Sequence, residues 1–331
     1  MSETASSTEL DTLPKLLRDK SRRIGDRSIA MRVKDRGIWQ SYTWKDYLEK
    51  VRDLCLGMIS LGLEPNDTVC IIGENKPEWF WAELAAQCAG ATAVGVFTDC
   101  SAKEVKYFVA HSEAKLVVAH DQEQVDKLLE VMEELPQLKK VIYWDPKGLW
   151  GVEYESLLSM EQALEIGRRF GKENPGLFDK MIDQGRGEDI ATISYTSGTT
   201  GLPKGAMMGH SLLVNLVKDW SGVDGWDKEG IEYLSFIPPA WATEQAIGIT
   251  GGLVGGLTVN FPEAPETVQE NIREIGPEVL FYGARLWENV NSTIQARMLD
   301  STLLRRWIYK RCLDTALQIA DFKIEKKGST G

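Results

Sequence analysis

The stretch IATISYTSGTTGLPKG, residues 190–205, joins an apolar run to a loop rich in glycine and hydroxyl side chains. Its first part, IATISYT (190–196), has the length and the apolar content of a buried β-strand. The loop ends in a lysine, Lys204, directly after Pro203. In α/β proteins ligands bind where strands end and loops begin, so this stretch predicts both a fold class and a binding site.

The composition of the loop indicates the kind of ligand. Glycines let backbone N–H groups approach an anion closely, and serine and threonine hydroxyls donate hydrogen bonds to phosphate oxygens. Lys204 adds a positive charge, and Pro203 restricts the turn that presents it. The spacing differs from the G-x-x-x-x-G-K-[ST] pattern of the common P-loop. We therefore predict a polyphosphate site, and we prefer it to the alternative of a solvated surface loop.

Strands and helices alternate on both sides of this loop. Apolar runs and helical patterns predict a first set of strands at 67–73, 91–97, 115–120 and 139–144, with helices at 75–90, 102–111 and 122–135. They predict a second set of strands at 190–196, 233–239, 256–261 and 278–284, with helices at 211–220, 243–253, 265–275 and beyond Leu286. Such alternation is typical of largely parallel sheets that helices cover on both faces.

The predicted fold is therefore α/β, with two similar α/β subdomains. The polar, glycine-containing stretch 171–189 is the predicted boundary between them. We expect residues 1–180 to form the first subdomain and residues 181–331 to form the second, which carries the phosphate loop.

Charge and composition argue against several classes of protein. A net charge of −11, with basic residues spread along the chain, disfavours nucleic-acid binding. The least polar stretch, 246–259, is too short and too rich in glycine to span a membrane, and the start lacks a secretory signal pattern. We therefore expect a cytoplasmic protein. The five cysteines are scattered without a CxxC pair, which favours reduced thiols over disulfides or metal ligands.

The segment YTSGTTGLPKG (195–205) resembles the signature loop of the adenylate-forming, or AMP-binding, superfamily. Four further segments resemble conserved segments of that family, at 73–97, 111–118, 189–200 and 205–210. ARLWENV (284–290) is similar to a segment typical of the long-chain fatty acyl-CoA synthetases. The resemblance covers nearly the whole chain, and it implies the start of the large N-terminal domain of such an enzyme.

The resemblance implies an AMP-forming ligase of fatty acid and lipid metabolism. Such an enzyme uses ATP and Mg²⁺ to convert a fatty acid, here a long-chain one, into an acyl-adenylate. Coenzyme A then takes the acyl group and AMP leaves. By resemblance, the β and γ phosphates are held by Thr196, Ser197, Gly198, Thr199, Thr200, Gly201 and Lys204. Thr196 is also the implied magnesium ligand.

The segment FIPPAWATEQ (236–245) resembles the family's acyl-site motif, with Trp241 at a position where long-chain members often have histidine. Trp241 is therefore either a gate of the fatty-acid tunnel or a buried core tryptophan. Glu244 is the catalytic candidate, expected as a carboxylate at a helix N-terminus with an electrostatic role. His210, which follows the loop, either contacts substrate or caps and hydrogen-bonds the next helix.

Later motifs of the family are not found in these 331 residues. They include Tyr-Gly-x-Thr-Glu, the aspartate that holds the ribose hydroxyls and the C-terminal lysine of adenylation. The resemblance thus implies a fragment, truncated at its C-terminal end and without the C-terminal lid domain, that is inactive alone. Two other functions stay open: an adenylating enzyme that loads a carrier-protein thiol or uses a different acid, and a non-catalytic nucleotide- or acyl-binding module. Peripheral membrane contact and a homodimer also stay open.

Overall fold

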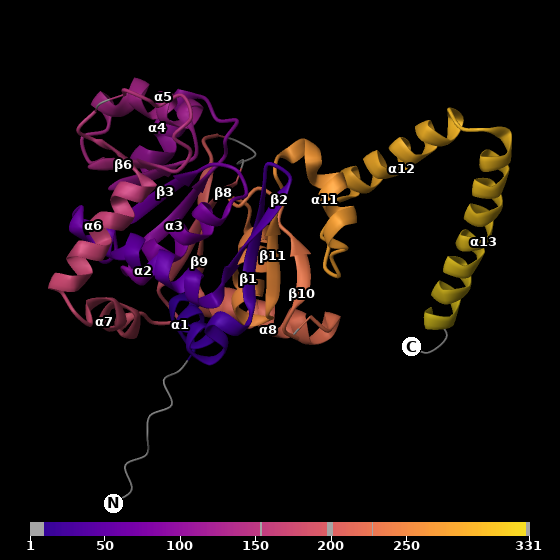
Figure 1. Cartoon of the computed structure of the whole chain (residues 1–331), viewed down its shortest axis with the longest axis horizontal. Helices are drawn as coiled ribbons and strands as arrows, with labels where there is room; N and C mark the ends of the chain where they lie inside the picture. Colours follow the sequence, from indigo (N-terminus) through magenta and orange to yellow (C-terminus); the bar gives the residue numbers. More distant parts are fainter. Residues whose placement is uncertain (1–9, 153, 197–200, 227, 329–331) are drawn as a thin grey trace, which may run out of the picture. The chain divides into compact units, whose positions relative to one another are not determined.

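The computed structural model describes residues 10–152, 154–196, 201–226 and 228–328. The chain divides into two compact units, a larger one that ends at Val279 and a helical one that begins at Leu280 (Figure 1). The larger unit contains both sheets and the predicted site, and it is described first.

A seven-stranded sheet forms the centre of the larger unit, with the strand order β7-β6-β5-β3-β4-β8-β9. Its strands are β3 (Thr68–Ile72), β4 (Thr92–Val96), β5 (Leu116–Ala119), β6 (Lys140–Tyr143), β7 (Leu157–Ser159), β8 (Ile190–Thr196) and β9 (Lys204–Gly209). Each pairs in parallel with its neighbour except β9, which is antiparallel to β8. The prediction of a largely parallel sheet is therefore confirmed.

Helices cover both faces of this sheet because successive side chains of each strand point to opposite faces. Val69 and Ile71 of β3 pack in one hydrophobic cluster with α2 (Trp44–Ser60) and α3 (Pro77–Cys88). Cys70 and Ile72 pack in a second cluster, with α4 (Ala102–His111) and α5 (Gln122–Val131). The side chains of Trp79, Phe80 and Trp81 on α3 are all buried, so this helix lies in the core (Figure 1).

A second sheet of four strands has the order β10-β11-β1-β2. Its strands are β1 (Ile29–Asp35), β2 (Ile38–Thr43), β10 (Ile231–Leu234) and β11 (Leu257–Phe261). β1 is parallel to β11 and forms a hairpin with β2 through Arg36 and Gly37, whose φ angles of 48° and 77° suit a tight hairpin turn. Phe80 of α3 meets Phe261 of β11 edge to face, with ring centroids 4.9 Å apart. α3 therefore packs against both sheets.

The pairing of the strands does not follow their order in the chain. Residues 190–196 were expected in the second set of strands, and that assignment is wrong, because β8 pairs with β4 in the first sheet. The second sheet instead takes β1 and β2 from the N-terminal part of the chain. The subdomain division between residues 180 and 181 itself stays a prediction.

The polar stretch 171–189 contains a helix that the sequence analysis did not predict, α7 (Leu177–Gln184). Phe178 and Ile182 of this helix are buried. Asp179 and Asp183 form ion pairs with Arg18 of α1 (Leu13–Ile24). The stretch is thus packed onto the N-terminal helix.

The region after β9 begins with α8 (His210–Asp224), which ends at Gly225 in the left-handed conformation, with φ of 73°. The helix expected at 243–253 consists of three segments, α9 (Ala242–Glu244), a π-helical segment η3 (Gln245–Thr250) and α10 (Gly251–Val254). α11 (Val268–Ile275) follows. The expected strand at 278–284 is reduced to one parallel bridge between Tyr233 and Val279.

The remaining elements complete the chain. α6 (Met160–Glu173) packs against α2, and short 3-10 turns occur at η1 (Gly25–Arg27), η2 (Met132–Glu134) and η4 (Pro265–Thr267). Gly167 allows the close crossing of α2 and α6, since a Cβ there would lie 1.7 Å from the carbonyl oxygen of Asp53. The helical unit consists of α12 (Ala284–Leu299) and α13 (Leu303–Gly328), which confirms the helical prediction beyond Leu286.

Candidate functional site

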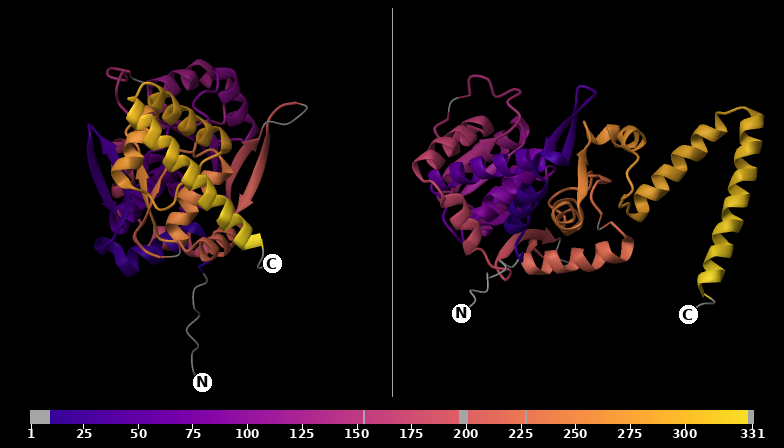
Figure 2. Two further views of the ribbon diagram at one scale, coloured as in Figure 1. Left: turned by 90° about the vertical axis from the view of Figure 1, so that its right-hand side faces the viewer. Right: turned by 60° about the horizontal axis from the view of Figure 1, so that its bottom comes forward.

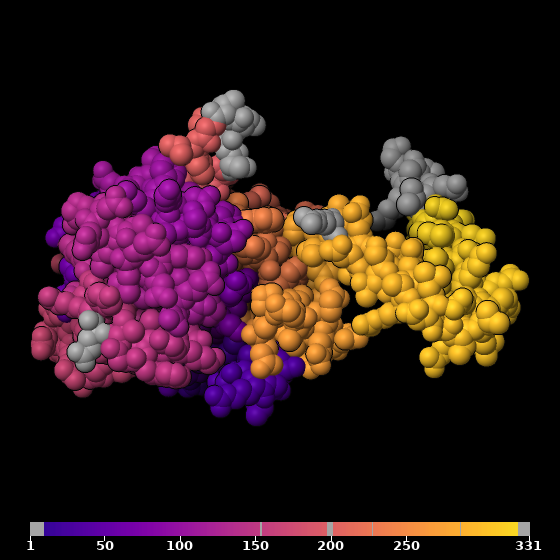
Figure 3. Space-filling view, turned by 90° about the horizontal axis from the view of Figure 1, so that it is seen from above, coloured from indigo at the N-terminus to yellow at the C-terminus, as the bar shows by residue number. Residues whose placement is uncertain are grey.

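The predicted phosphate loop connects β8 to β9 at the edge of the seven-stranded sheet. Thr196 is the last residue of β8 and is paired in register with Lys204, the first residue of β9. The Thr196 Oγ1 hydroxyl donates a hydrogen bond to the Lys204 carbonyl oxygen at 3.5 Å. The ends of these two strands extend away from the rest of the unit (Figures 2 and 3). The structure thus brings together the two predicted residues at the base of the loop.

Both residues are available to a ligand. Thr196 and Lys204 are exposed, and Lys204 forms no ion pair with any part of the chain that the structure describes. The 3.5 Å bond of Thr196 is at the weak limit of hydrogen bonding, so its hydroxyl oxygen can still bind a cation or a phosphate. Gly201 is also exposed, while Ser197, Gly198, Thr199 and Thr200 lie outside the described residues.

Helix α4 supports the base of the loop. The Tyr107 hydroxyl donates to the carbonyl oxygen of Pro203 at 2.9 Å. The His111 Nδ1 atom and the Tyr195 hydroxyl form a hydrogen bond of 2.7 Å. Because these contacts hold residues on both sides of the loop, Thr196 and Lys204 are presented from a fixed frame.

Trp241 directly precedes α9, in the stretch that follows β10. Its side chain is 51% exposed. The alternative of a buried core tryptophan is therefore wrong. The role of Trp241 as a gate stays a prediction.

Glu244 lies in the first turn of α9, as expected, but it is fully buried. Its carboxyl group accepts hydrogen bonds from the Tyr233 hydroxyl and, at 2.6 Å, from the Ser235 hydroxyl. Burial raises the pKa of Glu244 to about 8, and the two hydrogen bonds only partly oppose this. The expected role of a charged helix-terminal carboxylate does not suit such a group at neutral pH. Its catalytic role stays a prediction.

A second buried carboxyl group, Glu83 on α3, escaped the sequence analysis. It accepts hydrogen bonds from the side-chain nitrogens of Trp79 at 3.2 Å, Gln87 at 3.1 Å and Gln245 at 2.9 Å. Burial raises its pKa to about 7. The available signal was a glutamate inside the apolar helix WFWAELAAQC, four residues from both Trp79 and Gln87. The pairing with Gln245 left no local signal.

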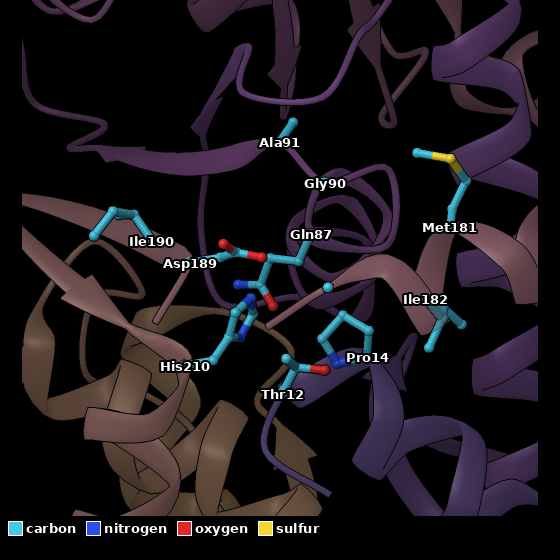
Figure 4. A pocket seen from close by; sticks show the side chains of 11 residues that line it. Thr12, Pro14, Gln87, Gly90, Ala91, Met181, Ile182, Asp189, Ile190 and His210 are labelled. Atoms are coloured by element: carbon cyan, nitrogen blue, oxygen red, sulfur yellow. The ribbon is translucent and has the colours of Figure 1, made fainter. Parts of the chain in front are cut away.

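His210 begins α8 and is buried against the N-terminal helix. Its Nδ1 atom accepts a hydrogen bond from the backbone N–H of Leu13 at 3.3 Å. The ring lines a cavity of about 20 Å³ together with Thr12, Gln87 and Asp189 (Figure 4). This volume suits one water molecule. Burial lowers the pKa of His210 to about 4, so the ring is neutral at physiological pH. The structure shows a scaffold contact, and a contact with substrate stays a prediction.

Metal and membrane features are sparse in the described part of the chain. Within it, no three His, Cys, Asp or Glu side chains gather in a way that could hold a metal ion. All five cysteines are free thiols, and Cys55, Cys70 and Cys88 are buried, as predicted. No described helix combines the length and the apolar character needed to cross a membrane.

Comparison with known proteins identifies the family. The family model of the AMP-binding enzymes matches residues 18–316. The chain belongs to the AMP-binding enzyme family. It is 28% identical over 308 residues to a long-chain-fatty-acid–CoA ligase of Xenopus laevis, covering 89% of this chain and 40% of that protein. A long-chain-fatty-acid–CoA ligase of Rattus norvegicus is 28% identical over 284 residues, covering 84% and 39%. The chain thus spans about two fifths of the length of these curated relatives.

Solved structures share the fold of this AMP-binding chain. The adenylation domain of a carboxylate reductase from Mycobacterium chelonae aligns with a TM-score of 0.69 and 18% identity, over 88% of this chain and 48% of that one. The acetoacetyl-CoA synthetase from Streptomyces lividans aligns with a TM-score of 0.60 and 19% identity, over 76% and 38%. The expected α/β fold of adenylate-forming enzymes is confirmed.

Proposed function

We propose that this protein is an AMP-forming ligase that activates a long-chain fatty acid with ATP and transfers the acyl group to coenzyme A. The observation that carries the proposal is the pair of exposed groups at the base of the loop, the Thr196 hydroxyl and the Lys204 ammonium, on adjacent ends of β8 and β9. The similarity to long-chain-fatty-acid–CoA ligases supports the choice of acid.

In the first step a carboxylate oxygen of the acid attacks the α-phosphorus of ATP. A bond forms between this oxygen and phosphorus, and the bond to the bridging oxygen of pyrophosphate breaks. Negative charge then grows on the leaving pyrophosphate, and fixed donors stabilise it. Lys204 provides a positive charge for this purpose. In the second step the coenzyme A sulfur attacks the acyl carbon, and AMP leaves with the electron pair.

The groups at the loop suit a phosphate-bound magnesium ion. Mg²⁺ prefers oxygen ligands and is held by few protein groups together with substrate phosphates. The exposed hydroxyl of Thr196 can be such a ligand, and Lys204 with the loop residues 197–201 would hold the phosphates. When bound, Mg²⁺ neutralises charge on the phosphates.

Trp241 is proposed to gate the acyl site, since its exposed ring stands at the start of α9. His210 is proposed to contact substrate, and its hydrogen bond with Leu13 fixes the start of α8 against α1. We propose the cytoplasm as the location of the enzyme. Peripheral contact with a membrane surface and a homodimer stay predictions.

The 331 residues do not contain the Tyr-Gly-x-Thr-Glu motif. We propose that this chain alone binds Mg·ATP weakly and does not catalyse acid-dependent exchange of pyrophosphate into ATP. Robust exchange with the 331-residue chain and palmitate would refute this part of the proposal.

The ligase activity itself is tested at the level of the gene. The coding DNA beyond codon 331 is sequenced, and the product of any in-frame continuation is assayed for palmitate-dependent exchange between ATP and pyrophosphate. Exchange that requires palmitate, followed by acyl transfer to coenzyme A, supports the proposal. Saturable binding of ATP without exchange in that product contradicts it and indicates a binding module.

A further inference from the structure

We propose that Glu83 is a positioning residue for the acyl-site stretch 236–245 and for Ser235 directly before it, because Glu83 holds Gln245 and through it the carbonyl group of Pro239. The inference rests on the proposed function only in assigning this stretch to the acyl site. The contact joins two residues that are 162 positions apart in the chain.

Gln245 forms a buried bridge between α3 and the stretch. Its Nε2 atom donates hydrogen bonds to Glu83 Oε2 at 2.9 Å and to the carbonyl oxygen of Pro239 at 2.8 Å. Glu83 and Gln245 are each only 1% exposed. Pro239 lies two residues before Trp241, so a fixed Pro239 carbonyl limits the positions that the tryptophan can adopt.

The beginning of the stretch is held by the same part of the chain. Asn75, two residues before α3, donates from Nδ2 to Ser235 Oγ at 2.8 Å and to the carbonyl oxygen of Ile237 at 2.7 Å. Ser235 in turn donates to Glu244. Asn75, two residues before α3, and Glu83, on α3, therefore hold the two ends of the stretch.

The π-helical segment η3, which begins at the end of the stretch, is held by a side-chain hydrogen bond. Gln245 is the first residue of η3, and its carbonyl oxygen accepts a hydrogen bond from Thr250 Oγ1 at 2.8 Å. Gly248 leaves room for Glu244, since a Cβ at this glycine would lie 2.1 Å from Glu244 Oε1. Single π-helical turns occur often at functional sites. Here the turn aligns the Gln245 side chain with Glu83.

The clamp, by which we mean Glu83, Gln245 and the carbonyl group of Pro239, requires a carboxylate at position 83. All three partners of Glu83 are N–H donors, and an ionised carboxylate can accept from each of them. The amide oxygens of Gln87 and Gln245 are buried and have no partner in the described structure, so both amides direct their NH₂ groups to Glu83. A glutamine at this position would turn its own NH₂ group toward one of these donors, leaving a buried hydrogen bond unmade.

Ionisable groups around Glu83 come from three other elements. Tyr47 of α2 faces it, and burial raises the pKa of that phenol well above 10. Glu244 of α9 has a pKa of about 8, and His210 of α8, across the cavity that Gln87 lines, has one of about 4. On α3 itself, burial raises the pKa of Cys88 well above 9. Of the groups named here, Glu83 and Glu244 have pKa values nearest to neutral pH.

The test compares Glu83→Gln with Glu78→Gln in the 331-residue chain, without any ligand. Glu78 is on the same helix, and within the described structure it forms no hydrogen bond with residues 235–250. Hydrogen exchange, corrected for the intrinsic rate, is measured for amides 236–250 from pH 6 to 8.5. A local opening of 236–250 leaves Glu83 buried on α3 and removes the hydrogen bond from Gln245 that lowers the pKa of Glu83. Ionisation of Glu83 therefore favours the closed stretch, and protection at 236–250 should rise with pH, even though the global free energy of unfolding falls over the same range. Glu83→Gln should lower protection about tenfold and remove the rise near pH 7, while Glu78→Gln keeps both.

Unchanged protection at 236–250 in Glu83→Gln overturns the proposal. So does an equal loss of protection in β3 and β5, because this would indicate general packing. If Glu83→Gln does not fold, Gln245→Met replaces it, since this change removes both bonds of the bridge and keeps two donors on Glu83. No loss of protection at 236–250 in Gln245→Met overturns the proposal equally. The exchange measurement involves no ATP or fatty acid, so a negative ligase assay does not contradict the role of Glu83. Conversely, unchanged protection in Glu83→Gln does not contradict the proposed phosphate site.

Discussion

The two halves of the proposed site are built in opposite ways. At the phosphate loop, Thr196 and Lys204 are neighbours in strand register, exposed and sparsely bonded. At the acyl-site stretch, Glu83, Glu244 and Gln245 are buried, and their hydrogen bonds are made within the protein. Groups that must bind a changing, charged ligand stay free, whereas the two buried carboxyl groups that shape the acyl-site stretch are hydrogen-bonded before any ligand arrives.

The largest effect expected from this contrast is on stability. Glu244→Leu removes the acceptor of two buried hydroxyls, those of Tyr233 and Ser235. We expect the free energy of unfolding to fall by about 3 kcal/mol, measured by urea denaturation. Lys204→Ala, at the exposed end of the site, should leave the same quantity within about 0.5 kcal/mol of the parent value. Equal effects of the two changes on the free energy of unfolding would contradict the proposed difference between the buried and the exposed part of the site.

The second effect is on ligand binding. Lys204→Ala removes an unpaired charge from the loop, and we expect the affinity for Mg·ATP to fall at least about tenfold, since hydrogen bonds to charged groups contribute about 1.5–3 kcal/mol. Equilibrium dialysis with labelled ATP measures it. Lys180→Ala, an exposed lysine on α7, is the matched control and should bind as the parent does. Loss of affinity in both variants would show that only overall charge matters.

The third effect is a dependence of stability on pH. Glu83 and Glu244 have pKa values of about 7 and 8 in the folded chain against an ordinary 4.5, so the folded state holds more protons between these values. Their contribution to the free energy of unfolding is fully present below pH 4.5 and is lost as the pH rises through 7 and 8. Glu244→Gln should therefore gain at least about 1 kcal/mol relative to the parent between pH 5 and 8.5. Parallel stability curves for the two proteins would show that Glu244 titrates normally.

The smallest effect concerns the exposed tryptophan of the acyl-site stretch. Trp241→Ala should change the free energy of unfolding by less than about 1 kcal/mol, because half of the ring already contacts solvent. Trp226→Ala, a buried tryptophan, should cost about 3 kcal/mol or more in the same thermal or urea measurement. A fall of about 3 kcal/mol in the free energy of unfolding with Trp241→Ala would contradict this prediction, because it would indicate that the ring is packed in the core.

The sequence was sufficient where the information is local. The apolar runs of β3 to β6, and the bounds of α4, followed from periodicity, and the loop chemistry pointed to Thr196 and Lys204. Partners that are distant in the chain could not be found in this way. β1 joins β11 across the sequence, β8 joins β4 rather than β11, and Glu83 meets Gln245. These pairings depend on topology and packing, for which a single sequence contains no periodic signal.

The π-helical turn at Gln245–Thr250 has a consequence for how such a site can change over time. A π turn contains one more residue than the α-helical turn it replaces, so deleting a single residue within it can restore a regular helix. Each residue of an α-helix corresponds to about 100° of rotation. One such deletion would turn the segment that carries Trp241 by this angle relative to α10, while β10 and β11 keep their places. The extra residue of the π-helical segment thus means that a deletion of one codon could change the direction of the exposed Trp241 side chain.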